Sequence, residues 1–247
     1  MENAMIESIL LTAAHIHTFN GDSQLTNATG FFFERDGRLF LVTSRHVFID
    51  EPNDHRPDRI EIELHTDPDN VAESTRFSIP LYEEKTAAWR QGIDSAGEID
   101  VAAIEIDREK LPEETLMHAF TPEHLQDPGG QVEVGTSILV VGFPLGFHDT
   151  LHHMPVARHA VIASSFGLRF KGEGYFLTDA RTHRGSSGAP IVMRVNRRNS
   201  PDEDLPWMLL GVHSARLDVG TRDLKLDEAL GLNVAWYADI LMTLTED

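Results

Sequence analysis

Apolar and polar residues alternate in short runs along most of this chain, and turn residues separate the runs. A period of two residues predicts strands with one buried face. The predicted strands cover residues 30–34, 39–43, 59–64 and 76–81 in the first half and residues 137–143, 156–165, 174–179, 190–195 and 207–213 in the second half. Asp36-Gly37, between the first two strands, is a strong signal for a tight hairpin. The pattern predicts an all-β protein.

A stretch rich in Pro, Gly and acidic residues separates the two sets of strands and runs from residue 111 to residue 130. Such a composition is typical of a connection between folded units. We therefore expect an N-terminal unit over residues 1–115, a linker over residues 116–130 and a C-terminal unit over residues 131–247.

The end of the chain departs from the strand pattern. After Leu232 the turn residues disappear, and the apolar positions take up helical spacing as far as Met242. Asn233 is a suitable N-cap residue for such a helix. We expect a terminal α-helix that packs on the second unit.

Composition narrows the class of protein. The chain has 247 residues, of which 41% are hydrophobic and 25% are charged, and these values are typical of a globular protein with a full core. Its formal net charge is −19, and a negative field of this size repels nucleic acid and anionic membrane surfaces. We expect neither of them as a partner.

The cysteine count and the N-terminal segment bear on location. The chain contains no cysteine, which indicates a reducing compartment. Residues 1–7 lack the basic region of a signal peptide, and no apolar stretch reaches membrane-spanning length. We expect a cytoplasmic protein.

Three segments carry residue types suited to nucleophilic catalysis. His46 lies in residues 41–47, Asp100 in residues 98–104 and Ser187 in residues 184–190. A serine hydroxyl becomes a good nucleophile when an imidazole takes its proton and a carboxylate orients the imidazole. Alone, each residue has a structural explanation as a turn serine, a strand-end histidine or a capping carboxylate. Together, in the order His, Asp, Ser, they favour a catalytic triad.

The order and the flanking residues also exclude other classes of hydrolase. α/β-Hydrolases have the order Ser, acid, His, and subtilisins have Asp, His, Ser. The Gly-x-Ser-x-Gly motif of an α/β-hydrolase is incomplete here, because Ala189 occupies the last glycine position.

Residues 175–190 resemble the nucleophile segment of chymotrypsin-fold serine proteases, closest to the bacterial trypsin-like and HtrA-type branch. The resemblance covers most of the chain. Its further motifs are Thr29-Gly30-Phe31, the block around His46, Asp100-Val101-Ala102, residues 141–146 and Gly211-Val212-His213-Ser214. The resemblance implies two six-stranded antiparallel β-barrels followed by the C-terminal α-helix.

The same resemblance implies a serine endopeptidase that acts through an acyl-enzyme, with no cofactor and no metal. Ser187 would attack the scissile carbonyl, His46 would serve as general base and then general acid, and Asp100 would orient His46. The backbone amides of Gly185 and Ser187 would form the oxyanion hole.

In proteases with this fold, the residues just before the nucleophile and the strand after it line the primary specificity pocket. The matching positions here are Arg181, Thr182, His213, Ser214, Ala215 and Arg216. The pairing of Thr182 with His213 is similar to that of glutamyl endopeptidases and of viral proteases that take Gln. We therefore expect a preference for Glu at P1, with Asp or Gln as lesser substrates, and charge-assisted contacts from Arg181 and Arg216.

Alternatives remain at this stage. His213 can instead be a structural histidine beside a pocket for small apolar side chains, as in HtrA-type enzymes. The whole chain can be a latent protease-fold binding or signalling module that a regulatory protein partner activates, or an esterase on the same fold. Residues 148–153 contain several possible metal ligands but no complete set, so we expect no metal there. The expected partner is a polypeptide substrate.

Overall fold

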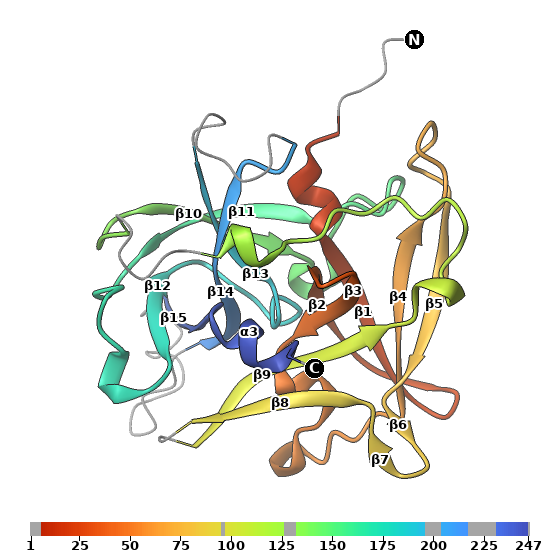
Figure 1. Cartoon of the computed structure of the whole chain (residues 1–247), viewed down its shortest axis with the longest axis horizontal. Helices are drawn as coiled ribbons and strands as arrows, with labels where there is room; N and C mark the ends of the chain where they lie inside the picture. Colours follow the sequence, from red (N-terminus) through yellow and green to blue (C-terminus); the bar gives the residue numbers. More distant parts are fainter. Residues whose placement is uncertain (1–5, 95–96, 126–131, 196–203, 217–230, 247) are drawn as a thin grey trace.

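The structure is a computed structural model that describes residues 6–94, 97–125, 132–195, 204–216 and 231–246. Figure 1 shows two β units side by side, with the N-terminal unit in red to yellow and the C-terminal unit in green to blue. The predicted all-β, double-barrel class is confirmed.

The N-terminal unit is built on one antiparallel sheet of seven strands, one more than expected, in the order β5-β4-β1-β2-β3-β9-β8. The strands are β1 (Ala13–Asn20), β2 (Ser23–Arg35), β3 (Arg38–Thr43), β4 (Arg59–His65), β5 (Ser74–Pro80), β8 (Trp89–Asp94) and β9 (Gly97–Ile106), with a small separate hairpin of β6 (Tyr82–Glu83) and β7 (Thr86–Ala87). Asp36-Gly37 joins β2 to β3 as a hairpin, as the sequence predicts.

The C-terminal unit is a closed barrel in the order β10-β11-β12-β15-β14-β13. Its six strands are β10 (Ser137–Gly142), β11 (Val156–Ile162), β12 (Tyr175–Asp179), β13 (Pro190–Arg194), β14 (Trp207–Arg216) and β15 (Leu232–Tyr237). The strand count agrees with the six-stranded barrel that the resemblance implies.

The predicted helix is present but shorter and later than expected. Asn233 is not an N-cap residue, because it lies in β15, which pairs with both β12 and β14. The terminal helix α3 covers Ile240–Leu244 and follows Asp239 at its N-cap position. Closing the barrel requires a strand between β12 and β14, and this long-range pairing outweighs the helical spacing of the segment.

Short helical turns connect the strands. The α-helical turn α1 covers Arg45–Phe48, and 3₁₀ turns cover Ser8–Thr12, Glu51–Asn53, Arg108–Lys110, Pro122–His124, Pro144–Gly146 and Phe170–Gly172.

One cluster of buried apolar side chains extends through both units. It contains Phe31 of β2 and Val101 of β9 together with Phe143, Val212 and Trp236 of the second unit. Burial of a shared apolar core holds the two units together. We call the interface between the two units, which this cluster occupies, the seam. Groups that face each other across the seam therefore keep a fixed relative position.

The first part of the predicted linker lies along the N-terminal sheet. Phe120 is fully buried, its N–H donates to the Phe32 carbonyl at 3.0 Å, and its own carbonyl accepts from the Glu34 N–H at 2.7 Å. Residues 126–130 of the linker fall outside the described residues. The exact domain boundaries stay a prediction.

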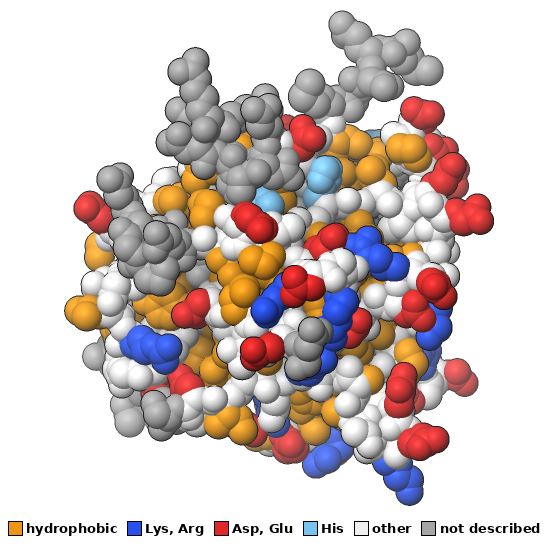
Figure 2. All heavy atoms as spheres, in the orientation of Figure 1, with side chains coloured by type: hydrophobic (Ala, Val, Ile, Leu, Met, Phe, Trp, Pro, Cys, Tyr) orange, Lys and Arg blue, Asp and Glu red, His pale blue; other side chains and the backbone are white. Residues whose placement is uncertain are grey.

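The surface matches the acidic composition. Figure 2 shows Asp and Glu side chains distributed over one face, with Lys and Arg between them. Across the described ranges, every helix is too short or too polar to cross a bilayer.

Candidate active site

His46 and Asp100 are brought together by the pairing of β3 with β9. Thr43, at the end of β3, lies opposite Ala102 of β9, so the turn α1 begins beside Asp100. The His46 Nδ1 atom lies 2.8 Å from Asp100 Oδ2, and the His46 N–H donates to Asp100 Oδ1 at 2.9 Å. The predicted carboxylate therefore holds both the ring and the backbone of the predicted base.

A third donor reaches Asp100 from the other unit. The Ser214 hydroxyl of β14 donates a short hydrogen bond to Asp100 Oδ2. The sequence placed Ser214 among the pocket residues, and it does line that pocket, but its hydroxyl is turned to the carboxylate. Asp100 is thus fixed by donors from both sides of the seam.

The electrostatics of this pair favour a charged carboxylate and a basic imidazole. Burial tends to lower the pKa of His46, but the hydrogen bond and the charge of Asp100 outweigh it and raise the pKa above the ordinary 6.5. Burial tends to raise the pKa of Asp100, but the hydrogen bonds from His46 and Ser214 and the His46 charge hold it below 3.8. A base of this kind accepts a proton readily near neutral pH.

Ser187 lies in the segment between β12 and β13, against the same part of the seam. The Gly188 N–H donates to the His213 carbonyl at 2.7 Å, and the Ser44 hydroxyl donates to that same carbonyl at 3.1 Å. The segments that carry Ser187 and His46 therefore meet at one carbonyl group of β14.

Only glycine fits directly after Ser187. A Cβ atom on Gly188 would lie 2.1 Å from Thr43 Oγ1 and 2.2 Å from the Thr29 carbonyl oxygen, and φ is +83°. The backbones at Gly188, Thr29 and Thr43 can approach this closely only because glycine has no side chain.

The hydrogen bonds from Arg184 to Ala189 leave three amides unused, and one of them is that of Arg184. Thr29 donates to two carbonyls of this segment, from Oγ1 to Gly185 at 2.7 Å and from its backbone N–H to Ser187 at 3.0 Å. The Arg184 carbonyl accepts from the Leu145 N–H at 2.5 Å, and the Ser186 carbonyl accepts from the Ala189 N–H at 3.0 Å. The N–H groups of Ser186, Gly188 and Ala189 donate to backbone carbonyls. Among the described residues, the N–H groups of Gly185 and Ser187 have no acceptor. These are the two amides that the sequence assigned to an oxyanion hole.

A pocket of about 150 Å³ opens beside Ser187. Its other lining residues are Thr182, His183, Arg184, His213, Ser214 and Ala215. Arg181 is exposed and does not line the pocket, and the side chain of Arg216 lies outside the described residues. His183 and Arg184 were missed by the sequence prediction, although both lie between Thr182 and Gly185.

The comparisons with known proteins agree with this geometry. Residues 28–197 match the family model of the trypsin-like peptidase domain. The chain belongs to the trypsin-like peptidase domain family. No curated protein matches it. Among solved structures, it is similar to the serine endoprotease from Yersinia pestis, with a TM-score of 0.55 and 14% sequence identity. That match covers 96% of this peptidase domain and 62% of the Yersinia chain, and at this identity it shows the fold.

The polar groups of the peptidase domain's pocket have defined hydrogen-bonding roles. Burial lowers the pKa of His213 to about 4, so its ring is neutral at pH 7. Its Nδ1 atom is buried with no partner among the described residues, so Nε2 is the ring nitrogen through which it can act. The Thr182 hydroxyl donates to Asn233 Oδ1 at 2.5 Å, and its oxygen remains able to accept.

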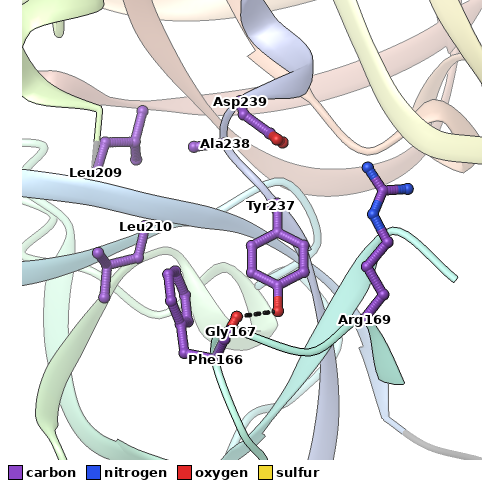
Figure 3. Close-up of a pocket in the computed structure, with 8 residues that line it drawn as sticks. All are labelled: Phe166, Gly167, Arg169, Leu209, Leu210, Tyr237, Ala238 and Asp239. Atoms are coloured by element: carbon purple, nitrogen blue, oxygen red, sulfur yellow. Dashed lines mark hydrogen bonds between the residues drawn. The ribbon is translucent and has the colours of Figure 1, made fainter. Parts of the chain in front are cut away.

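A second pocket, on the C-terminal barrel, contains none of the predicted site residues. It measures about 210 Å³ and is lined by Phe166, Gly167, Arg169, Leu209, Leu210, Tyr237, Ala238 and Asp239. Figure 3 shows the Tyr237 hydroxyl turned to the Phe166 carbonyl, with which it forms a hydrogen bond of 2.5 Å. Burial raises the pKa of Tyr237 to about 12, so this phenol is a fixed donor. Its lining is mostly apolar and supplies no nucleophile.

The segment of residues 148–153 contains His148, His152 and His153. Across the part of the chain that the structure describes, no group of three or more His, Cys, Asp or Glu side chains is placed to hold a metal ion. His148 and His153 instead take part in ring contacts, His148 with His15 and Phe143.

His15 makes the stability of the fold sensitive to acid. It is a β1 residue, 6% exposed and stacked on Phe143, with 4.4 Å between the ring centroids. Burial, followed by the charge of His17, lowers its pKa from 6.5 to about 3. Between these two values the unfolded chain binds a proton that the folded chain does not. Stability is therefore present above pH 6.5 and lost as the pH falls.

We expect the free energy of unfolding to fall between pH 6.5 and 4, with His15 contributing about 1 kcal/mol per pH unit. Urea unfolding at several pH values measures it. The variant His15→Phe keeps a stacked ring and should flatten the dependence, whereas His159→Phe, at an exposed site, should not. Equal slopes in wild type and His15→Phe would contradict this account.

Proposed function

We propose that this trypsin-like peptidase domain is a serine endopeptidase that cleaves polypeptides through an acyl-enzyme, with a preference for Glu at P1. The observation that carries the proposal is the pair of unused amides at Gly185 and Ser187, on a segment that meets the segment of His46 at the His213 carbonyl. The ring of His46 is held by a carboxylate. A nucleophile, a base with its orienting group and an oxyanion site are the parts that acyl transfer requires.

In the proposed reaction, Ser187 Oγ forms a bond to the scissile carbonyl carbon while its proton passes to His46 Nε2. The carbonyl oxygen becomes an oxyanion that accepts from the Gly185 and Ser187 N–H groups. Collapse of this intermediate breaks the C–N bond, and His46 returns the proton to the leaving amine. Water then attacks the acyl carbon while His46 takes its proton. Collapse of this second intermediate breaks the bond to Ser187 Oγ, releases the new carboxyl terminus and returns the proton to Ser187.

Asp100 supports this cycle without exchanging a proton. Its contact with His46 Nδ1 keeps the proton on that nitrogen, so Nε2 presents a lone pair to the serine. Its negative charge also stabilises the imidazolium that forms during each half of the reaction. The Ser214 hydroxyl keeps the carboxylate in place.

The pocket supports a P1 side chain that carries a terminal oxygen. His213 can donate from Nε2, the Thr182 oxygen can accept, and Arg184, an exposed residue, also lines the pocket. A glutamate carboxylate accepts from His213 and is attracted by Arg184. A glutamine amide accepts from His213 and donates to Thr182. Arg184 therefore favours Glu over Gln, whereas the sequence prediction expected charge-assisted contacts from Arg181 and Arg216.

A P1-varied peptide library tests the specificity. We expect kcat/KM for Glu to exceed that for Leu or Ala by at least about tenfold, because a buried polar pocket rejects side chains that leave its groups unpaired. His213→Phe should abolish that difference while keeping the ring volume. Arg184→Gln should lower the ratio of Glu to Gln, whereas Arg181→Gln, at an exposed site outside the pocket, should leave it unchanged. Equal rates for Glu and Leu in wild type would overturn the proposal.

Fluorophosphonate labelling separates a constitutive enzyme from a latent, partner-activated module. The Arg184 carbonyl accepts a hydrogen bond from the Leu145 N–H. The Arg184–Gly185 peptide is trans, so the Gly185 N–H points away from that carbonyl and from Leu145. The oxyanion amides are therefore free in the isolated chain, which favours constitutive activity. We expect wild type to label at Ser187 without additions. Labelling only with an added partner protein would support the latent module.

A further inference from the structure

Thr29 links the N-terminal unit to the proposed oxyanion hole. It lies in β2 and is fully buried. Its hydroxyl donates to the Gly185 carbonyl at 2.7 Å, and its backbone N–H donates to the Ser187 carbonyl at 3.0 Å. Two of the four anchored carbonyls around the oxyanion amides are therefore held by this one residue.

The same hydroxyl also fixes the segment on the other side of Gly185. It accepts from the Phe143 N–H at 3.0 Å, and two residues later the Leu145 N–H holds the Arg184 carbonyl at 2.5 Å. The hydroxyl thus holds the Gly185–Ser186 peptide plane directly. Through the Phe143 N–H it also holds the segment whose Leu145 N–H fixes the Arg184–Gly185 plane, which carries the Gly185 N–H. Because it donates once and accepts once, it leaves neither partner unpaired.

The surrounding backbone leaves room for Thr29. A Cβ atom on Gly142 would lie 2.5 Å from Thr29 Oγ1, and a Cβ atom on Gly188 would lie 2.2 Å from the Thr29 carbonyl oxygen. The Thr43 hydroxyl in turn donates to that carbonyl at 2.7 Å. Strands of both units therefore close around this residue, and its hydroxyl has no freedom to turn elsewhere.

We propose that Thr29 is a positioning residue for catalysis, whose hydroxyl aims the Gly185 amide at the developing oxyanion. The inference rests on the proposed function. An oxyanion donor acts only when it is pre-aimed at the charge that develops, and a displacement of about 1 Å can cost roughly 100-fold in rate. Because the amide matters most in the transition state, its displacement lowers kcat and leaves KM nearly unchanged.

The test compares three substitutions at residue 29 with one matched control. Thr29→Val keeps the shape and removes the hydroxyl, Thr29→Ser keeps the hydroxyl, and Thr29→Cys supplies a weaker donor if the valine variant does not fold. Thr12→Val is the control, because the Thr12 hydroxyl is equally buried and donates to the Ile9 carbonyl at 2.8 Å, away from the site.

We expect Thr29→Val to lower kcat about 10- to 100-fold with KM within about threefold of wild type. The inhibition constant of a peptide trifluoromethyl ketone, whose adduct carries an oxyanion, should rise by the same factor as kcat/KM falls. Thr29→Ser should stay within about threefold of wild type in kcat, Thr29→Cys should fall between the serine and valine variants, and Thr12→Val should lose stability only.

Two results would overturn the inference. One is a folded Thr29→Val, or a folded Thr29→Cys in its place, with the kcat of wild type. The other is a loss that appears in KM while ketone affinity stays constant. Failure of the proposed function is recognised separately, because wild type itself would then neither take a fluorophosphonate nor cleave peptides.

Discussion

Replacing Ser187 with alanine is expected to lower kcat about a million-fold, to the level that substrate binding and the oxyanion amides alone support. The hydroxyl is the atom that forms the acyl bond in the proposed reaction, so no neighbouring group can substitute for it. Peptide hydrolysis at high enzyme concentration measures the residual rate, and intact-mass analysis shows whether a fluorophosphonate adds to the chain.

The adjacent serine supplies the control. Ser186 is buried, and its N–H donates to the His183 carbonyl at 3.1 Å. This hydrogen bond stabilises the loop that carries Ser187. Ser186→Ala should label at Ser187 at a rate within about tenfold of wild type, because only a side-chain hydroxyl outside the reaction is lost. Full labelling of Ser187→Ala, with none in Ser186→Ala, would show that Ser186 and not Ser187 is the nucleophile.

Short apolar runs between turn residues were enough to predict most of the strands, including β3, which is almost wholly buried. They missed β1, β8 and β9, none of which falls in the predicted ranges. The apolar spacing also predicted the start of a helix in β15. The pairing that makes this segment a strand is with β12 and β14, and distant pairings of this kind leave no periodic signal within ten residues.

The candidate site divides in the same way. His46, Asp100 and Ser187 stand out in the sequence because each lies in a short motif and the three occur in an informative order. Ser214 as a donor to Asp100 and Thr29 as a donor to Gly185 do not stand out, because their partners lie 114 and 156 residues away. These contacts exist only after two separate units have packed, so local pattern cannot reveal them.

The residues of the specificity pocket were predicted only in part. His213 and Thr182 were found by their place relative to the nucleophile, and both line the pocket. Of the two predicted arginines, Arg181 does not line the pocket, and the side chain of Arg216 lies outside the described residues. Arg181 and Arg184 are equally prominent in the sequence and both are exposed, but only Arg184, in the turn at residues 184–185, lines the pocket.

Changing Asp100 to asparagine is expected to lower kcat about ten-thousand-fold with little change in fold. Asp100 accepts from His46 Nδ1, the His46 N–H and the Ser214 hydroxyl, and an amide has only one oxygen with which to accept. An amide nitrogen facing Nδ1 would force the ring proton to Nε2, where it blocks transfer from the serine. The acid limb of the pH profile should also move. In wild type Asp100 raises the pKa of His46, so kcat/KM should rise with a midpoint above pH 6.5.

Without the carboxylate that midpoint should fall, because burial, the largest effect on the pKa of His46, is then opposed only by the charge of Asp50. The surface pair of Asp149 with His152 Nδ1, at 2.7 Å, is a matched control, since Asp149→Asn removes an aspartate from a histidine ring without touching the seam. Steady-state kinetics from pH 5 to 9 measure both effects. A kcat within tenfold of wild type in Asp100→Asn, with an unmoved acid limb, would mean that this carboxylate does not orient the base.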